Sequence, residues 1–418
     1  MTRSRQFQLT VAFLALATAL APRPAHASVF VLAQVRVTLD STYGCVSCHS
    51  EMRRSFIAGI HSEWGMRCHD CHGGDPGAFE IPAGHRQPFL GTPTKRETVQ
   101  LCASCHSDPN QMRQYGLPAD QLAEFRTSRH GELLLTRGIN DGPACTDCHD
   151  AHTILPPEDA RSDVHPTNIS ATCATCHDDA EMMAPYGIPV DQFETYRQSA
   201  HGTSLYEEGN YAAPTCANCH GSHAALPAPP GEVPNVCGQC HVLVRQEFYA
   251  GPHGDATLAG ELAGCLACHS QHGTEHIPSD GVQATCRECH ESGGPSDAIA
   301  GALQETLVQA EQDLEAARRS IEELVLHGRD VTTARLRFRT AQANQLQLEL
   351  VQHSLDSVRI EDLSRRVRST SRGIQEMAEV SSERRWEHKL MAIPVWFLAL
   401  AVVAFSAIKL SVVRRSRD

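Results

Sequence analysis

Nine Cys-x-x-Cys-His runs lie between Cys45 and His290, and together they contain all 18 cysteines of the 418-residue chain. This spacing is typical of c-type haem attachment: the two thiols add to the haem vinyl groups, and the adjacent histidine binds iron as the proximal ligand. Zinc knuckles need two cysteine pairs around one ion and do not require a histidine after each pair. Disulfides suit an exported protein but leave the nine histidines unexplained. We therefore predict nine covalently attached haem c groups.

The predicted haem-attachment residues follow directly from the motif. The thioether cysteines are Cys45, Cys48, Cys68, Cys71, Cys102, Cys105, Cys145, Cys148, Cys173, Cys176, Cys216, Cys219, Cys237, Cys240, Cys265, Cys268, Cys286 and Cys289. The proximal iron ligands are His49, His72, His106, His149, His177, His220, His241, His269 and His290.

The second axial position of each iron decides function. A second histidine there makes the iron six-coordinate and suited to electron transfer, whereas an open position lets a small substrate bind. Nine further histidines are candidates for this position. The predicted distal ligands are His61, His130, His201 and His253, each five residues after an aromatic side chain; His152, His223 and His272, each three residues after a motif histidine; and His85 and His353, which complete the count.

An internal repeat supports seven of these candidates. Residues 102–131 align without gaps to residues 173–202, an offset of 71 residues that also matches His152 to His223. A repeated histidine at a fixed distance from an aromatic residue or a motif indicates a ligand. His85 lies where the second motif lacks a trailing histidine, and His353 lies within the predicted second helix of the C-terminal region. These two assignments rest on the count alone.

The stretch PACTDCHDAHTILP, residues 143–156, shows which haem a trailing histidine can serve. His149 and His152 are three residues apart, so on a turn their side chains lie on one side, with Cβ atoms roughly 5–6 Å apart. The two axial nitrogens of one haem lie on opposite faces of the ring. We therefore expect His152 to bind the iron of a neighbouring haem.

The remaining histidines and two methionines have simpler interpretations. His165 has no counterpart in the matching repeat and is disfavoured as a ligand. His69, His276, His327 and His388 are interpreted as non-ligands. The sulfur atoms of Met112 and Met183 could bind iron in principle, but core packing explains both residues.

Composition and charge limit the fold and the partners. About 29 residues of chain are available for each motif between Ser28 and His290, so porphyrins rather than side chains should fill the interior. The predicted fold class is mainly α with much irregular loop: a haem-packed multihaem cytochrome c region, then an antiparallel helical bundle or stalk, then one C-terminal transmembrane helix. The net charge of −13 disfavours nucleic acid and favours a basic partner.

The two ends predict an exported, anchored protein. Arg3 and Arg5, an apolar run and Ala25-His26-Ala27 predict a cleaved signal peptide over residues 1–27. Residues 390–408 are apolar and uncharged, which predicts a transmembrane helix over 389–413. Three arginines make the tail, 414–418, cytoplasmic by the positive-inside rule. The haem region, residues 28–295 with its repeat of about 71 residues, would face the periplasm at the bacterial inner membrane.

After Gly294 the composition changes to that of long helices. Leu303, Leu307, Ala310, Leu314, Ala317, Ile321 and Leu324 form a heptad seam. The sequence HGRD at 327–330 predicts a helix stop and a new N-cap. A second helix is expected from about Val331 to Val358, and a third has Leu363, Val367, Ile374 and Met377 on one face. Residues 296–388 therefore predict an antiparallel bundle, which could also mediate a homo-oligomer.

With these motifs in hand, the chain resembles the multihaem c-type cytochromes of anaerobic respiration. The runs CHDAH, CHGSH, SRHG, SAHG and CHGGDP are similar to those of membrane-associated periplasmic cytochromes with paired haem motifs. The long helices after the last motif are similar in kind to those of the superfamily that includes pentahaem nitrite reductase, hydroxylamine oxidoreductase and octahaem tetrathionate reductase.

The chain departs from these similar cytochromes in three respects. None of its lysines, Lys95, Lys389 and Lys409, follows a cysteine pair, so the Cys-x-x-Cys-Lys catalytic motif of pentahaem nitrite reductases is missing from the sequence. The predicted anchor is C-terminal, whereas tetrahaem quinol dehydrogenases have an N-terminal anchor. The predicted span contains no histidine and cannot hold haem b, so a separate membrane subunit would have to oxidise quinol.

Two functions follow from the two states of the distal position. The first is an electron-transfer protein that carries electrons through bis-histidine haems between a quinol-linked membrane complex, or another redox protein, and a periplasmic or outer-membrane acceptor. The alternative is an oxidoreductase that acts on nitrite, hydroxylamine or tetrathionate at one five-coordinate haem. The matched ligand count favours electron transfer over an enzyme with its own substrate.

Overall fold

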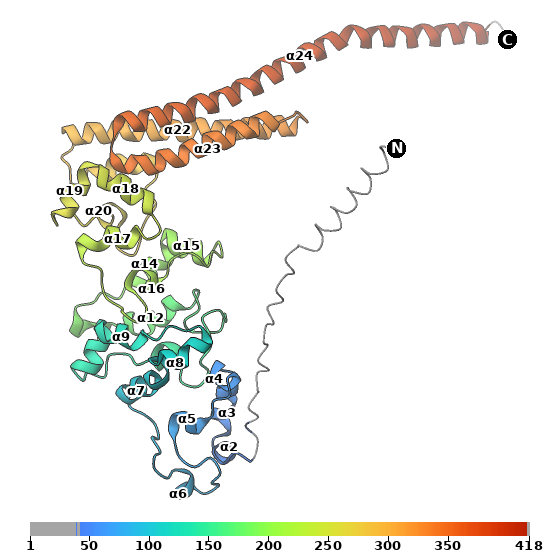
Figure 1. Ribbon diagram of the computed structural model, residues 1–418. Coiled ribbons are helices and arrows are strands. Elements are labelled where there is room, and N and C mark those ends of the chain that lie inside the picture. Colours follow the sequence, from blue (N-terminus) through green and yellow to red (C-terminus); the bar gives the residue numbers. More distant parts are fainter. Residues whose placement is uncertain (1–38, 40–41, 416–418) are drawn as a thin grey trace, which may run out of the picture. The chain divides into compact units, whose positions relative to one another are not determined.

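The computed structural model describes residue 39 and residues 42–415, with the backbone alone described at residues 230, 381–392 and 411–415. The predicted signal peptide, residues 1–27, and residues 416–418 of the predicted tail lie outside the described residues. The described chain is about 65% helix and contains no strand (Figure 1). The mainly α fold class is therefore confirmed.

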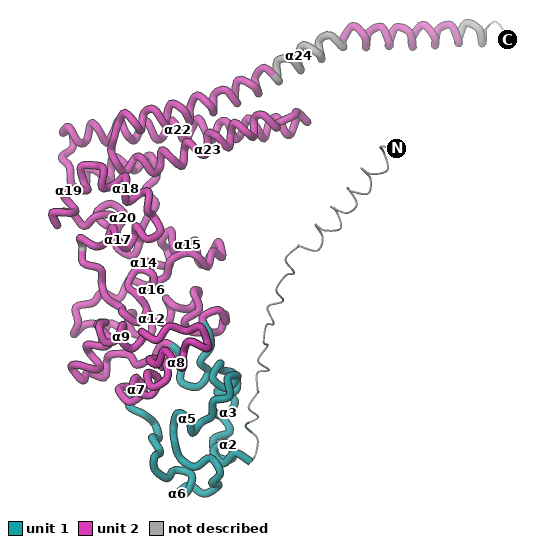
Figure 2. The backbone as a smooth tube through the Cα atoms, in the orientation of Figure 1, with its two compact units in different colours: residues 1–94, 149–156 teal, residues 95–148, 157–418 magenta. Residues whose placement is uncertain are grey.

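The chain divides into two compact units, coloured separately in Figure 2. Unit 1 comprises residues 1–94 and 149–156, and unit 2 comprises residues 95–148 and 157–418. The helices of unit 1 are α2 (Gly44–Cys48), α3 (Ser50–Ile57), α4 (Ile60–Glu63), α5 (Cys68–His72) and α6 (Ile81–Gly84).

The helices between Thr94 and Gly294 are short, because proline, glycine and the haem motifs interrupt them every few residues. The longest has 12 residues. They are α7 (Lys95–His106), α8 (Pro109–Met112), α9 (Gln121–Thr127), α10 (Arg129–Gly131), α11 (Thr146–His149), α12 (Ile169–His177), α13 (Ala180–Met183), α14 (Gln192–Gln198), α15 (Ala200–Tyr206), α16 (Cys216–His220), α17 (Val233–Cys237), α18 (Val242–Ala250), α19 (Pro252–Leu258), α20 (Leu266–His269) and α21 (Val282–Cys286). Single helical turns lie between them: η1 (Arg113–Tyr115), η2 (Glu132–Thr136), η3 (Ala184–Tyr186), η4 (Pro230–Glu232) and η5 (Ser279–Gly281).

The 71-residue sequence repeat folds twice into the same local structure. Asp108 and Asp179 each accept hydrogen bonds from backbone N–H groups at the start of the next short helix, as N-cap carboxylates do. Gly116 and Gly187 follow with left-handed φ values of 69° and 63°, which end that segment without steric strain. Equivalent residues therefore start and stop helices at equivalent places.

The repeated Ser-x-His-Gly run explains how two candidate ligands are positioned. Ser128 accepts a hydrogen bond from the N–H of Gly131 at 2.9 Å, and Ser199 accepts one from Gly202 at 3.0 Å. A Cβ atom on Gly131 would lie 1.8 Å from the Phe125 carbonyl oxygen, so only glycine fits there. The chain thus turns back, just before each histidine, against the helix that carries the preceding aromatic residue, α9 or α14.

Three long helices follow the last motif and lie side by side (Figure 1). They are α22 (Pro295–Leu326), α23 (Thr332–Val351) and α24 (Ser357–Arg415). The first two are joined by a turn in which Gly328 is left-handed and the Asp330 carboxylate accepts a hydrogen bond from Thr332 N–H at 2.9 Å. The helix stop expected from HGRD is therefore observed.

The seam of the bundle contains the residues that the heptad pattern selects. One end packs Leu307 and Ala310 against Leu348, Val351, Ile360 and Val367. The other end packs Ala317, Ile321 and Leu324 against Val331, Ala334 and Ile374. The pairing of the start of α22 with the end of α23 shows that these two helices are antiparallel. The buried alanines have little side-chain volume, which lets the helix axes approach closely.

The second bundle helix is shorter than the sequence indicates. We expected it to reach Val358, but it ends at Val351 and continues into a single 3-10 turn, η6 (Gln352–Ser354). Leu355 then takes a left-handed φ of 55°, and the Asp356 carboxylate accepts hydrogen bonds from Val358 and Arg359 N–H groups as α24 begins. The reversal of chain direction contains no glycine or proline, the residues that commonly mark a helix end, so the sequence does not reveal it.

The end of α24 is apolar. Residues 393–410 have a mean hydropathy of 2.1, and none of them is buried. This segment is long and apolar enough to cross a membrane, and it falls within the predicted span.

Replacing Leu348 should destabilise the bundle, because its side chain is fully buried between α22 and α24. Leu348→Ala should lower the free energy of unfolding by roughly 2–5 kcal/mol, through lost apolar burial and the cavity left behind. Denaturant unfolding of the full chain in detergent, followed by helical circular dichroism, measures this. Leu346→Ala is the matched control: Leu346 is 62% exposed and its loss should change stability by no more than about 0.5 kcal/mol. Equal losses in both variants would contradict the packing described.

Candidate functional site

The Cys-x-x-Cys-His runs form single helical turns. In α5 and α16 the motif is the whole helix, and α7 and α12 end at the motif histidine. Residues three and four apart share a helix face, so both thiols and the imidazole of a motif point the same way. All 18 cysteines lie in the described part of the chain, and none forms a disulfide.

Each of seven motif histidines faces one of the predicted distal histidines. Their ring centroids are 6.0–6.3 Å apart. The pairs are His49 and His85, His72 and His152, His177 and His130, His220 and His272, His241 and His201, His269 and His353, and His290 and His253.

This separation fits one metal ion between two imidazoles. Imidazole nitrogen binds transition metals at about 2.0–2.1 Å, and a nitrogen lies just over 1 Å from its own ring centroid, so two opposed ligands place their centroids roughly 6.3 Å apart. Rings in van der Waals contact would lie closer. The seven pairs therefore have the spacing of two axial ligands on one iron, with the motif cysteines beside one of them.

An eighth motif histidine, His106, lies near His223. Burial lowers the pKa of His106, and the charge of His223 lowers it further, which places the two rings near each other. The remaining motif histidine is His149, and the remaining predicted distal ligand is His61. Both belong to unit 1, and both make contacts within the described residues.

Hydrogen bonds orient several of the rings. The Nδ1 atom of His72 lies 2.8 Å from the Gly91 carbonyl oxygen, that of His269 lies 2.9 Å from the Glu275 carbonyl, and that of His353 lies 3.1 Å from the Glu349 carbonyl. A carbonyl accepts, so Nδ1 carries the proton in each ring. The unprotonated Nε2 atom is then free to bind a metal.

Burial favours the neutral form of three ligand candidates. It lowers the pKa of His130, His201 and His353, and the opposed histidine of each pair adds to the effect. A neutral imidazole is the form that binds a metal ion. The electrostatics of these rings thus suit ligation at pH 7.

The trailing histidine His152 lies opposite His72, which belongs to a motif other than its own. Its segment, residues 149–156, is held against the turn between α3 and α4 by a hydrogen bond from Ile60 N–H to the Ile154 carbonyl at 2.8 Å. Gly59 permits this approach, because a Cβ there would lie 2.8 Å from the His152 carbonyl oxygen. His223 and His272 likewise lie near motifs other than their own, those of His106 and His220.

His85 follows α6 in a loop that also supports His72. The Phe89 ring stacks on His85 with centroids 4.3 Å apart. Two residues later, the Gly91 carbonyl accepts the hydrogen bond from His72, and Leu90 N–H donates to the His72 carbonyl at 2.8 Å. One loop therefore positions ligand candidates of the first and second motifs. Phe89 was not identified from the sequence, because it follows the histidine instead of preceding it by five residues.

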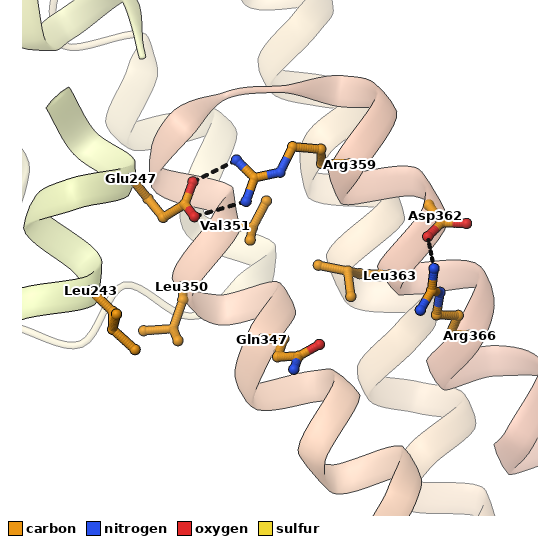
Figure 3. Close-up of a pocket in the computed structure, with 9 residues that line it drawn as sticks. All are labelled: Leu243, Glu247, Gln347, Leu350, Val351, Arg359, Asp362, Leu363 and Arg366. Carbon is orange, nitrogen blue, oxygen red and sulfur yellow. Dashed lines mark hydrogen bonds and ion pairs between the residues drawn. The ribbon is translucent and has the colours of Figure 1, made fainter. Parts of the chain in front are cut away.

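His353 belongs to the bundle and not to the haem region. It lies in η6, at the hairpin between α23 and α24, and was expected inside a continuous helix. Arg359, just inside α24, makes two hydrogen bonds of 2.7 and 2.8 Å to the Glu247 carboxylate on α18 (Figure 3). This bidentate pair borders an open cavity of 360 Å³ that α18, α23 and α24 line. These two hydrogen bonds fix the bundle to the haem region beside His353, the histidine that the bundle contributes.

A second contact fixes the start of the bundle to the ninth motif. Asp297, in the first turn of α22, is only 5% exposed. Its carboxylate accepts hydrogen bonds from Arg287 Nε at 2.8 Å, Gln283 Nε2 at 2.9 Å and Gly293 N–H at 2.7 Å. Arg287 lies between Cys286 and Cys289, so this network holds the motif itself.

The motif cysteines of unit 2 adjoin one another in chain order. The first cysteines of motifs three and four, five and six, and seven and eight lie close enough for one thiol to lower the pKa of the other: Cys102 and Cys145, Cys173 and Cys216, and Cys237 and Cys265. The second cysteine of the fourth, sixth and eighth motifs lies near both cysteines of the next motif. Cys148 lies near Cys173 and Cys176, Cys219 near Cys237 and Cys240, and Cys268 near Cys286 and Cys289. Consecutive motifs from the third to the ninth are therefore neighbours in space.

The other histidines and the methionines have structural environments. His165 is buried, with Nδ1 2.7 Å from the Thr167 hydroxyl oxygen and its ring edge-on to Tyr211. His69 Nδ1 lies 2.6 Å from the Tyr43 hydroxyl. Met112 and Met183 are buried, which agrees with core packing. The side chain of His388 lies outside the described residues.

Zinc-like coordination would bring three or four ligands together. Among the described residues, no group of three or more His, Cys, Asp or Glu side chains converges in this way. The candidate ligands are arranged instead as opposed pairs.

Neutralising Asp297 should loosen the junction between α22 and the ninth motif. Its guanidinium and N–H partners lower the pKa of Asp297 to about 2, below the ordinary value of about 3.9. The charged form therefore stabilises the fold above about pH 4, and this contribution disappears as the pH falls towards 2. Asp297→Asn should lower the denaturant midpoint at pH 7, and its difference from the unaltered protein should shrink at pH 3. Glu311→Gln, exposed on the same helix, is the control; the idea fails if both variants unfold alike at pH 7.

Comparison with known families agrees with this geometry. Residues 139–242, which contain four of the nine motifs, match the family model of cytochrome c3. The match supports a multihaem c-type cytochrome with covalently bound haem and an electron-transfer role. No solved structure matches the chain.

Proposed function

We propose that this multihaem c-type cytochrome carries electrons through nine bis-histidine haems. The opposed histidine pairs carry the proposal: seven have the spacing of two axial ligands. His106 and His223 make the eighth pair, and His61 and His149 make the ninth by elimination. The motif cysteines would hold each porphyrin by thioether bonds. When bound, haem supplies a one-electron ferric/ferrous couple, which the protein side chains do not supply.

The arrangement of the pairs favours electron transfer over catalysis. With a histidine on both faces of every iron, no position is open for a substrate. The alternative oxidoreductase needs one five-coordinate haem, and His85 and His353 are the assignments where such a site would be expected. Each of these rings lies 6.3 Å from a motif histidine. That spacing supports electron transfer, which requires only that iron gain and lose an electron without a change of ligands.

The contacts between consecutive motifs support a chain of haems. Thioether cysteines from the third to the ninth motif adjoin in order, so the attached porphyrin edges would be close neighbours. Electrons would then pass along the haem region instead of remaining at isolated sites. The bundle would take part as well, because its His353 would ligate the iron attached at Cys265 and Cys268.

The location follows from the ends of the chain. The signal peptide would export the haem region to the periplasm, the apolar end of α24 would anchor it in the inner membrane, and the tail would remain cytoplasmic. About 36 helical residues separate Ser357 from the apolar segment, which corresponds to about 54 Å along the axis. Quinol in the bilayer would therefore need a separate membrane subunit to pass its electrons on. The acidic haem region favours basic redox partners, and the bundle surface could mediate a homo-oligomer.

The coordination state of the resting protein tests the proposal directly. Electronic and magnetic spectra of the purified holoprotein should show nine low-spin irons and no high-spin signal. Reduced protein should turn over none of nitrite, hydroxylamine and tetrathionate. A resting high-spin iron together with turnover of one of these species would favour the alternative enzyme.

Ligation by the bundle can be tested with two histidines in matching environments. His353 and His327 each follow a bundle helix and have Nδ1 on the carbonyl oxygen four residues earlier. His353→Ala should convert one of nine irons to high spin, because only His353 faces a motif histidine in the described structure. His327→Ala should leave all nine low-spin. Identical spectra for the two variants would refute ligation by His353.

The assignment of His152 predicts how two substitutions combine. His152→Ala should open the iron of His72, and His61→Ala should open the iron of His149. The double variant should therefore contain two high-spin irons, as counted by magnetic resonance. If His61 and His152 served one haem, the double variant would contain only one.

A further inference from the structure

A carboxylate lies beside one of the candidate iron ligands. Glu124 Oε2 is 3.6 Å from His223 Nδ1. Glu124 lies in α9, whereas His223 follows α16, so tertiary structure brings them together. Both side chains are partly exposed, with about two-fifths of each accessible. The nitrogen nearest the carboxylate is Nδ1, which leaves Nε2 of His223 for the iron.

Three other ligand candidates have weaker acceptors at the same nitrogen. Main-chain carbonyl groups lie at the Nδ1 atoms of His72, His269 and His353, at 2.8–3.1 Å. A carbonyl carries only a partial charge, whereas an ionised carboxylate carries a full one. The environment of His223 is thus electrostatically different from these three.

The charge acts on the iron through the ring. A carboxylate facing the N–H of a metal-bound imidazole makes that imidazole a stronger electron donor. It also stabilises the more positive ferric state over the ferrous state through space. Both effects lower the reduction potential, and hydrogen bonding and charge around axial ligands are established means of tuning it.

We propose that Glu124 lowers the reduction potential of the haem attached at Cys102 and Cys105, whose axial ligands are His106 and His223. The inference rests on the proposed function, because it requires that these two histidines bind one iron. Glu124 is a positioning and tuning residue and does not itself bind the metal. Its effect is to disfavour the electron on this haem relative to haems whose ligands face carbonyl groups.

The repeat places a different residue at the position of Glu124 in its second copy. Position 124 corresponds to Thr195 in the second copy, although the residues around it match: Gln121 with Gln192, Phe125 with Tyr196 and His130 with His201. The carboxylate is therefore not part of the framework that the two copies share. Helix α9 and helix α14 have the same length and the same cap positions with either residue.

Glu124→Gln tests the proposal in the full-length holoprotein. The amide keeps the size of the side chain and removes its charge. Spectroelectrochemical titration should show one haem shifted to higher potential. An increase of roughly tenfold in its ferrous-to-ferric ratio at fixed potential, the lower end of typical outer-shell effects, corresponds to about 59 mV for one electron. Glu124→Asp keeps the charge on a shorter side chain and should give a smaller shift.

Glu194→Gln is the matched control for a general change of charge. Glu194 is exposed on α14 and bonds only to Gln198 Nε2 among the hydrogen bonds described, at 2.6 Å. The same loss of one charge there should move the potential of the affected haem much less. Equal shifts in the two glutamine variants, or no shift in Glu124→Gln, would overturn the proposal. Haem content and circular dichroism show that each variant is folded and fully loaded.

Substitution of His223 separates this inference from the ligand assignment. His223→Ala should give one high-spin iron and remove the low-potential component that Glu124→Gln shifts. If His223→Ala leaves nine low-spin irons, the assignment of His223 as a ligand is wrong. If it gives a high-spin iron but Glu124→Gln shifts nothing, the ligand assignment stands and the role of Glu124 is wrong.

Discussion

The opposition of histidine rings in pairs, with centroids 6.0–6.3 Å apart, governs this structure. A motif supplies one histidine on a single helical turn, together with the thiols that would attach the porphyrin. The partner must arrive from the opposite side, roughly 6 Å away, and residues close in sequence cannot reach that position. Every pairing that the structure describes therefore joins separate segments, from the loop that returns His85 to His49 to the distant segments of His106 and His223.

This constraint explains why so little apolar core is needed. The helices of the haem region are short, and its buried side chains form small clusters such as Leu39, Tyr43 and Phe56 or Val99, Leu134 and Ala144. Glycines at points of close backbone approach, and serine and aspartate caps, set the path of the chain instead. In the proposed holoprotein, axial bonds and thioether bonds would supply the long-range connections that apolar packing supplies in ordinary domains.

The bundle follows a different rule, since packing between its heptad seams stabilises it. It is nonetheless joined to the haem region at three places: the Asp297 network, the Arg359–Glu247 pair and the turn that carries His353. A simple tether would need none of these contacts. Two of them involve the eighth and ninth motifs, which in the proposed holoprotein suits a bundle that both anchors the haem region and completes its ligands.

The sequence alone was sufficient to predict the mainly α fold, the seam of the bundle and the turn at 327–330, because each depends on local spacing. It also indicated which histidines are candidates for the distal position, because the repeat and the count mark them. Which histidine faces which motif depends on contacts between distant segments, and no local pattern encodes these. Tertiary structure decided that His152 lies opposite His72 and that the bundle hairpin at Leu355 brings His353 to His269. It also placed Glu124 beside His223, since the two residues share neither a motif nor a helix.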